Sequence, residues 1–327
     1  MLELSLACQN IDRSRAILDG RVAVDGVRLT LIPGSPEEIF QRAFRHQEFD
    51  IAELSLSTHL LTTARGDSKY VGIPAFVSRA FRHSAIYIRA DAGIESPQAL
   101  RQKRIGVPDF QQTAGVWVRG MLADEYDVGR GDVHWHMGGL EQPGRSARMP
   151  LNLQNGIRID FIGPQQTLAT MLAAGELDAV IAPRAPSSAN GNGQIRRLFA
   201  DYRKAEEDYY RKTRLFPLMH VIGIRRSLVE KHPWLPMNVF AAFSKARRLA
   251  IDDLGRMDTL AIIHPWIAEE MSRLRALMGE DIWPYGIERN RNELTTLIRY
   301  AEADGLIKGP VALEALFAEP TFDQFNF

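Results

Sequence analysis

The chain has 327 residues, of which 45% are hydrophobic and 24% charged. These values are typical of a globular protein with about two domains. Forty basic and forty acidic side chains cancel, so the sequence gives no sign of a nucleic-acid or anionic membrane partner. No apolar run approaches the roughly 20 residues that span a bilayer. A single cysteine, Cys8, excludes an internal disulfide and a cysteine-rich metal site.

The first ten residues, MLELSLACQN, alternate leucine with polar or small residues and predict a strand over Leu2 to Ala7. They lack the basic region, the long apolar region and the small-residue cleavage site of a secretory signal peptide. The sequence therefore predicts a cytoplasmic protein.

Strands and helices alternate through the first part of the chain. Ser35 precedes Pro36 and two glutamates, a pattern typical of a helix start, with a capping serine, a proline in the first turn and acids near the positive end of the dipole. The third strand leads to Ser57 and Thr58, which can cap the next helix. The predicted elements are strands over 2–7, 27–32 and 50–54 and a helix from 35 to about 46.

A second series of alternating elements follows Arg89. The predicted elements are helices over 96–100, 112–126 and 167–174 and strands over 104–107, 133–136 and 177–182. Residues 137–156 are rich in glycine, proline and charge and predict a long loop or flap over the ligand.

An apolar strand returns at FPLMHVIGI, residues 216–224, and helices follow it. The predicted helices are 227–232, 236–251, 258–279 with an interruption at Pro265, and 292–303. Alternation of this kind predicts an α/β fold. We expect two α/β lobes, one formed by residues 1–86 and 222–327 and the other by residues 87–221. Crossing strands near Tyr87 and Val221 would join the lobes, with the ligand cleft between them.

The segment 76–89, FVSRAFRHSAIYIR, gathers charge around a strand-like run, 84–88. A buried strand normally avoids such neighbours, because a charge taken from water must be paired or used. The charged residues are Arg79, Arg82, His83 and Arg89. Arginine suits carboxylates, so the sequence predicts a ligand that carries a carboxylate.

Five segments together resemble the 4,5-dihydroxyphthalate decarboxylase family, whose fold is similar to that of type II periplasmic binding proteins. They keep their order over nearly the whole chain, and they are SRAFRHSAIYIR, GVPDFQQTAGVWVRGMLADEYDV, GGLEQPGR, FPLMHVIGIRRSLVEKHPW and MGEDIWPYGIERNRNEL. The stretch GVPDFQQTAGVW looks like the strand, loop and helix that hold a ligand anion in that fold. The segment PLNLQNGIRID, residues 150–160, does not match, which leaves the ring substitution of the substrate open.

The resemblance implies that one carboxylate is removed from a dihydroxylated phthalate to give protocatechuate, a step of phthalate degradation. One carboxylate must be held, and the ring carbon that loses the other must be protonated. The hydroxyl para to that carbon supplies the electronic push, so we expect no cofactor, although a catechol could chelate a divalent ion. We expect a small aromatic carboxylate as the partner, with no nucleic acid or membrane partner, and the sequence allows a homo-oligomer without fixing the oligomeric state.

The alternative is a non-catalytic solute-binding protein of an ABC-type transporter for an aromatic carboxylate, because the fold is shared. A second alternative is another enzyme on the same fold. The absence of a signal peptide argues against a transport role, and histidines in apolar segments favour an enzyme, because pure binding needs no proton donor.

The segment 76–89 supplies the first catalytic candidates. Arg82 could clamp the retained carboxylate, and His83 could donate the proton, since histidine titrates near neutral pH. The alternative is an inter-domain salt-bridge network. Arg79 is a substrate-binding candidate or a structural partner of this pair.

His220 lies in the second crossing strand, where a histidine needs a partner. It is either the active-site acid or a hinge residue whose hydrogen bonds are satisfied. Arg184 follows the predicted strand 177–182 and could point into the cleft, or it could be an ordinary surface arginine.

Hydroxyls and free backbone N–H groups at a helix start suit an anion. Ser57 and His59 at one helix start, and Thr113 with Gly115 at another, are therefore further substrate-binding candidates, against the alternative of ordinary capping or packing. His134 and His136 flank Trp135 on one strand face, but without a nearby carboxylate or cysteine they are a weak metal signal, and we predict no metal site.

Overall fold

The computed structural model describes residues 1–144, 153, 157–189, 191, 193–256 and 258–322. They fall into two compact units. Unit 1 comprises Met1–Arg79, Leu218–Leu294 and Val311–Phe327, and unit 2 comprises Ala80–Pro217 and Thr295–Pro310. Both chain crossings lie earlier than the sequence suggested, and unit 2 takes in a second segment, 295–310, that the sequence did not reveal. Asp304 in that segment pairs with Arg119 and Arg130 of unit 2.

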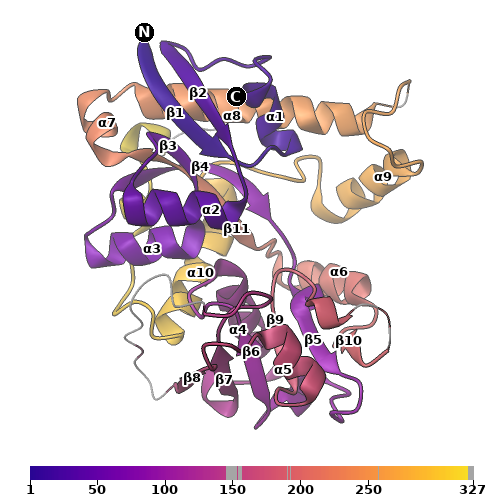
Figure 1. Ribbon diagram of the computed structural model, residues 1–327. Coiled ribbons are helices and arrows are strands. Elements are labelled where there is room, and N and C mark those ends of the chain that lie inside the picture. The colour runs from indigo at the N-terminus through magenta and orange to yellow at the C-terminus, as the bar shows by residue number, and fades with distance from the viewer. Residues whose placement is uncertain (145–152, 154–156, 190, 192, 257, 323–327) are drawn as a thin grey trace. The chain divides into compact units, whose positions relative to one another are not determined.

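Unit 1 is built on a mixed sheet with the strand order β2-β1-β3-β11-β4 (Figure 1). Its strands are β1 (Leu2–Cys8), β2 (Val27–Pro33), β3 (Ile51–Ser55), β4 (Tyr70–Arg79) and β11 (Leu218–Arg225). Its helices are α1 (Asp12–Leu18), α2 (Pro36–Gln41), α3 (Leu56–Arg65), α7 (Arg226–Lys231), α8 (Leu235–Gly255), α9 (Ile267–Met278) and the first turn of α10 (Arg291–Ala303).

The directions of the strands place several strand ends at one edge of this sheet. β1 runs parallel to β2 and β3, whereas β11 runs antiparallel to β3 and β4. The carboxyl ends of β1 and β3 therefore lie at the same edge as the amino end of β11. The pairing of β11 with β4 shifts register on both sides of His220. Such irregularities re-aim side chains and are common beside active sites.

Backbone carbonyls in the irregular stretch of β4 accept hydrogen bonds from other segments. Pro74 accepts a hydrogen bond from the Gly286 amide at 2.9 Å, and Phe76 accepts one from the Trp283 indole at 2.8 Å. Arg13 Nε donates to the Val77 carbonyl at 2.9 Å. These bonds satisfy the buried polar groups that the shifted sheet pairing leaves open.

The helix α2 of unit 1 begins where the sequence indicates, but it ends at Gln41, and residues 42–46 form a π-helical turn. The Ser35 hydroxyl accepts a hydrogen bond from the Glu38 amide and caps α2, whose first residue is Pro36. α2 and α3 contact β3, α8 contacts β4, and α1 packs against α8.

Unit 2 has its own sheet with the strand order β10-β5-β9-β6-β7-β8. Its strands are β5 (Ile86–Arg89), β6 (Arg104–Val107), β7 (His134–Met137), β8 (Ile159–Phe161), β9 (Ala179–Ile181) and β10 (Ile195–Arg197), and its helices are α4 (Thr113–Tyr126), α5 (Leu168–Ala174), α6 (Tyr202–Thr213) and the rest of α10. Leu168, Leu172, Leu177 and Val180 are buried together in its core.

The predicted α/β class is confirmed, and three local predictions were wrong. The strand predicted from Ser84 begins at Ile86, because residues 83–85 form a short 3-10 turn. Residues 97–100 also form only a 3-10 turn. The helix predicted over 258–279 begins at Ile267, since Pro265 lacks an N–H donor and disfavours helix in the residue before it. Most of the predicted flap, including 145–152, lies outside the described residues.

Candidate active site

A carboxylate and a histidine form a short hydrogen bond at the edge of the unit 1 sheet. His220 pairs with Ser55 in the register of β11 and β3, and Glu53 lies two residues before Ser55. The distance from His220 Nδ1 to Glu53 Oε1 is 2.6 Å. An ionised carboxylate only accepts hydrogen bonds, so Nδ1 carries the proton of this bond.

Glu53 is fully buried, and Gln9 holds it in place. The Gln9 amide donates to Oε2 at 2.9 Å, and Gln9 Nε2 donates to Oε1 at 2.7 Å. Burial alone would raise the pKa of Glu53, but the hydrogen bond and charge of His220, together with the Gln9 bonds, bring that pKa below its ordinary value. Glu53 is therefore a carboxylate at neutral pH.

His220 keeps one ring nitrogen available. Its side chain is 17% exposed, and the ring meets Phe40 edge to face at 4.8 Å between ring centroids. Within the described part of the chain, Nε2 has no hydrogen-bond partner. A histidine that donates to a carboxylate through Nδ1 has a fixed ring orientation, and its Nε2 can exchange a proton with a ligand.

Buried hydroxyls follow at the start of α3. Ser55, Ser57 and Thr58 are all at most 2% exposed. Ser55 Oγ lies 3.3 Å from Ser57 Oγ and accepts a hydrogen bond from Thr58 Oγ1 at 3.2 Å. Backbone N–H groups at a helix start favour an anion, so this corner of unit 1 offers hydroxyls, a positive helix end and His220 together.

The other two unit 1 candidates are held by structural contacts. His59 Nε2 lies 2.8 Å from the Leu316 carbonyl, and burial lowers the pKa of His59 to about 4. Arg79 bonds to the Pro284 carbonyl at 2.8 Å and to Asn290, and it lies 3.5 Å from Glu293. Burial, partly offset by Glu293, lowers the pKa of Arg79 to about 10. Both residues tie later segments to the sheet.

His83 lies in unit 2, in an aromatic cage. Its ring centroid is 5.0 Å from that of Phe199, 5.2 Å from that of Tyr209 and 6.3 Å from that of Tyr126. Among the described residues, neither ring nitrogen has a hydrogen-bond partner. Burial lowers the pKa of His83 to about 4, so the ring is neutral at pH 7.

Arg82 precedes this cage and is only partly exposed. Burial lowers its pKa to about 10, against the attraction of Glu206. Burial in turn raises the pKa of Glu206, although its carboxylate accepts a hydrogen bond from the Ser84 amide at 3.2 Å.

The remaining unit 2 candidates lie after two neighbouring strands. Thr113 is the first residue of α4 and is buried. A Cβ added to Gly115 would lie 3.0 Å from Arg119 Nη1, so the glycine makes room for a buried guanidinium beside the helix start. Arg184 follows β9 and is exposed.

The structure thus brings Ser57 and His220 to one sheet edge in unit 1, while Arg82, His83, Thr113, Gly115 and Arg184 belong to unit 2. The sequence analysis missed Glu53 and Gln9. A signal existed for Glu53, because it is the one charged residue in the otherwise apolar run IAEL, and a buried charge needs a partner.

Neither a metal-binding cluster nor a membrane-spanning helix is found in the part of the chain that the structure describes. There, no group of three or more histidine, cysteine or acidic side chains could hold a metal ion, and this includes His134 and His136. No helix in that part is long and apolar enough to cross a membrane.

Two proteins of known description are similar to this chain. A protein of Comamonas testosteroni described as 4,5-dihydroxyphthalate decarboxylase is 42% identical over 326 residues, which covers 99% of both chains. A protein of Pseudomonas putida with the same description is 48% identical over 211 residues, covering 64% of this chain and 82% of the other. No family model matches the chain.

Among solved structures, the periplasmic aliphatic sulphonate binding protein SsuA from Escherichia coli is similar in fold. Its TM-score is 0.56 at 13% identity, over 99% of this chain and 100% of the other. At that identity the likeness concerns the fold alone.

Proposed function

Because the chain belongs to the 4,5-dihydroxyphthalate decarboxylase family, we propose that it removes one carboxylate from 4,5-dihydroxyphthalate and releases protocatechuate and CO₂. The observation that carries this proposal is the similarity to a described decarboxylase over 99% of both chains.

The reaction exchanges a C–C bond for a C–H bond. The hydroxyl para to the reacting carbon pushes electron density into the ring, and that carbon takes up a proton. The bond to the carboxylate then breaks, its electron pair restores the aromatic ring, and CO₂ leaves. One proton is consumed, so the enzyme needs a proton donor that water can recharge.

His220 is the best-supported proton donor. The Glu53 carboxylate lies 2.6 Å from Nδ1 and stabilises the imidazolium, while Nε2 is left to deliver the proton. His59 and His83, whose pKa values are lowered to about 4, are neutral at pH 7 and are weaker candidates. After the transfer, neutral His220 regains a proton from solvent.

The start of α3 could hold the retained carboxylate. The Ser57 hydroxyl and the first amides of α3 provide donors beside His220. Four residues of unit 2 remain predictions for substrate binding, and they are Arg82, Thr113, Gly115 and Arg184. Calorimetry with phthalate tests them, and a variant such as Arg82→Ala with unchanged affinity would remove that residue from the site.

We also propose that turnover needs no cofactor, because the para hydroxyl supplies the electrons that the ring carbon requires. The protein would act in the cytoplasm, as expected from the sequence, which cell fractionation can test.

The direct experiment incubates the purified protein with 4,5-dihydroxyphthalate in the presence of a chelator. We expect stoichiometric CO₂ and protocatechuate, measured by gas analysis and chromatography. Tight binding without product would contradict the proposal and favour a solute-binding role. Product that appears only after a divalent ion is restored would contradict the cofactor-independent reaction.

A further inference from the structure

The segment that leads from β1 into α1 bonds to the strands on both sides of β11. The amide of Gln9, which follows β1, donates to Glu53 in β3 at 2.9 Å. Arg13 Nε donates to the Val77 carbonyl in β4 at 2.9 Å. β11 lies between β3 and β4, and Val77 directly precedes the residue of β4 that pairs with His220. Arg13 is therefore bonded to β4 beside the strand that carries the proposed proton donor.

The guanidinium of Arg13 is held in one orientation. Its Cζ lies 4.1 Å from the centroid of the Trp283 ring, and the Trp283 indole N–H donates to the Phe76 carbonyl of β4 at 2.8 Å. Nη1 lies 2.6 Å from Asp12 Oδ1, and the side chain is 19% exposed. A guanidinium that is stacked on a ring and bonded at two nitrogens loses little further conformational entropy when it binds a ligand.

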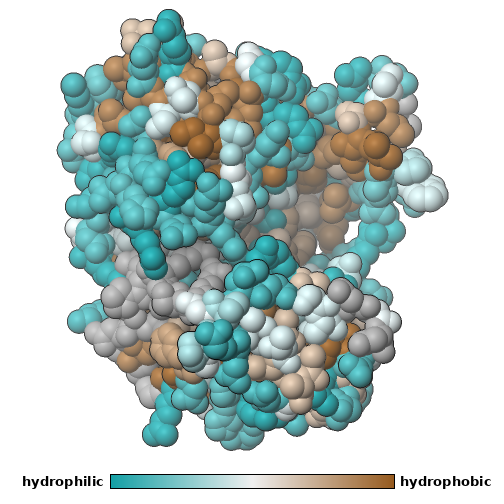
Figure 2. Space-filling model, in the orientation of Figure 1, coloured by the Kyte–Doolittle hydropathy of each residue, from teal (hydrophilic) through white to brown (hydrophobic). Residues whose placement is uncertain are grey.

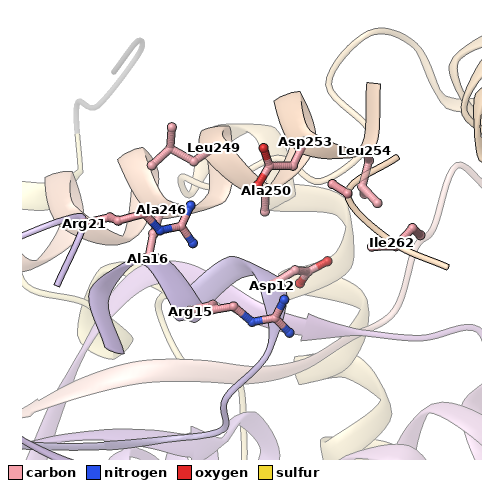
Figure 3. A pocket seen from close by; sticks show the side chains of 11 residues that line it. Asp12, Arg15, Ala16, Arg21, Ala246, Leu249, Ala250, Asp253, Leu254 and Ile262 are labelled. Carbon is pink, nitrogen blue, oxygen red and sulfur yellow. The ribbon is translucent and has the colours of Figure 1, made fainter. Parts of the chain in front are cut away.

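Two other arginines of unit 1 lie in more ordinary surroundings. Figure 2 shows a largely hydrophilic surface over α2, and Arg42 at the end of this helix pairs with Glu38 and with Glu48. Arg15 of α1 is exposed and lines a shallow groove between α1 and α8 (Figure 3). Arg13 does not line this groove and bonds to β4 instead. Its position therefore differs from that of a solvated surface arginine.

Arg13 keeps one donor nitrogen available. Nε bonds to Val77 and Nη1 to Asp12, whereas Nη2 makes no hydrogen bond with any residue that the structure describes. The Arg13 charge also acts on Tyr285, whose phenol is neutral at pH 7 because burial raises its pKa. Among the described residues, Asp12 is the only carboxylate in a salt bridge with Arg13. A guanidinium has five N–H donors, so it can bind a second carboxylate as well.

The candidate site of unit 1 otherwise offers neutral donors to a carboxylate. The Ser57 hydroxyl and the first amides of α3 carry no formal charge, whereas a charge-assisted hydrogen bond is roughly twice as strong as a neutral one. We propose that Arg13 supplies the charged donor for the carboxylate that the substrate retains, an inference that rests on the proposed function. The adjacent ring carbon would then face His220, since neighbouring strands lie only about 4.8 Å apart.

Calorimetry of the full-length protein with two unreactive ligands tests the assignment. Phthalate has both carboxylates and no hydroxyl, whereas catechol has both hydroxyls and no carboxylate. We expect Arg13→Gln to weaken phthalate binding roughly 10- to 100-fold, by the usual strength of a hydrogen bond to a charged group, and to leave catechol binding unchanged. Arg13→Lys should recover part of the affinity, because it keeps the charge but lacks the planar fork.

Two further variants separate binding from a structural effect. Arg15→Gln is the matched control, because it removes the same charge from the same helix at an exposed arginine that interacts with Asp19. It should keep wild-type affinity for both ligands. Asp12→Asn leaves Arg13 in place and keeps an oxygen acceptor, but it removes the competing negative charge. It should therefore bind phthalate severalfold more tightly than wild type.

The possible outcomes distinguish Arg13 from the proposed reaction. Wild-type phthalate affinity in Arg13→Gln, or an equal loss in Arg15→Gln, would overturn the role of Arg13 and leave the reaction untouched. Weaker phthalate binding in Asp12→Asn would also contradict it. If phthalate binding depends on Arg13 but the wild type releases no CO₂ from 4,5-dihydroxyphthalate, the proposed reaction fails and the carboxylate-binding role stands.

Discussion

His59, His83 and His220 differ in the groups that their rings contact. His59 contacts a backbone carbonyl, His83 contacts aromatic rings and has no hydrogen-bond partner among the described residues, and His220 contacts a carboxylate. A carboxylate partner stabilises the protonated ring, whereas an apolar cage favours the neutral one. This difference in partners, and not position in an apolar strand, is why His220 is the proposed proton donor.

The cage of His83 predicts a specific dependence of stability on pH. The pKa of His83 is lowered from 6.5 to about 4 in the folded state. Between these values the unfolded chain binds a proton that the folded chain does not, so stability falls as the pH falls. We expect His83 to account for about 2 kcal/mol of the loss between pH 7 and pH 5.

The variant His83→Phe should therefore lose less stability than wild type over this range, as measured by urea unfolding at both pH values. His59→Phe is the matched control, because it also removes a titrating ring but sacrifices the hydrogen bond to Leu316 and should be destabilised at both pH values. An unchanged pH dependence in His83→Phe would show that His83 binds its proton as readily in the folded protein as in the unfolded chain.

Residue types indicated which side chains could take part in catalysis, but not which of them would contact each other in the fold. A histidine in an apolar strand needs a partner, and His220 was a candidate for that reason. Its partner Glu53 comes from another strand 167 residues away in sequence. Only the pairing of β11 with β3 brings the two together, and no local pattern encodes that register.

At the scale of elements, α4 and α10 show how closely two helices pack. Trp117 of α4 and Tyr300 of α10 meet edge to face at 5.6 Å, and a Cβ added to Gly120 would overlap the Tyr300 ring. The Tyr300 hydroxyl donates to Asp124 at 2.8 Å, which holds the ring in place. The glycine is thus required by its neighbour on α10.

We expect Gly120→Ala to destabilise the protein by about 1–3 kcal/mol, since overpacking outweighs the gain of about 1 kcal/mol in helix propensity. Gly255→Ala at the end of α8 is the control, because the added methyl would make only ordinary contact at 3.6 Å with Arg275. Thermal unfolding compares the two. Equal melting temperatures would mean that Tyr300 moves aside without cost.

Most helices and strands could be predicted from the sequence, because helix capping and hydrophobic periodicity are local signals. Pro36 and Ser35 began α2 as expected, and Gly175 ends α5 with a positive φ of 79°. The sequence failed to predict local structure where contacts with distant segments determine it. β4 loses regular pairing, since carbonyls of its middle bond to Arg13 and to the segment 283–286.

At the scale of the molecule, the least predictable feature is the return of residues 295–310 to unit 2. Asp304 is fully buried, and it accepts hydrogen bonds from Arg119 at 2.6 and 2.9 Å and from Arg130 at 2.8 Å. Burial lowers the pKa of Arg119, and the attraction of Asp304 opposes that effect. A contact over 185 residues of sequence leaves no local signal.

Asp304→Asn should destabilise the protein by about 3–5 kcal/mol, because Arg119 would stay buried without a compensating charge. Asp208→Asn, which breaks exposed pairs on α6 of the same unit, should leave the stability almost unchanged, because solvent screens exposed pairs. Urea unfolding measures both. If the two variants were equally stable, the buried pair would not be what attaches residues 295–310.

The central claim is that His220, held by Glu53, delivers the proton that replaces CO₂. The most direct measurement is kcat of His220→Asn with 4,5-dihydroxyphthalate, alongside its affinity for phthalate. We predict a loss of kcat on the order of 10²-fold or more with little change in affinity, since the proton is needed only in the transition state. Glu53→Gln should lower kcat in the same way but less severely. A His220→Asn enzyme with near wild-type kcat would contradict the account.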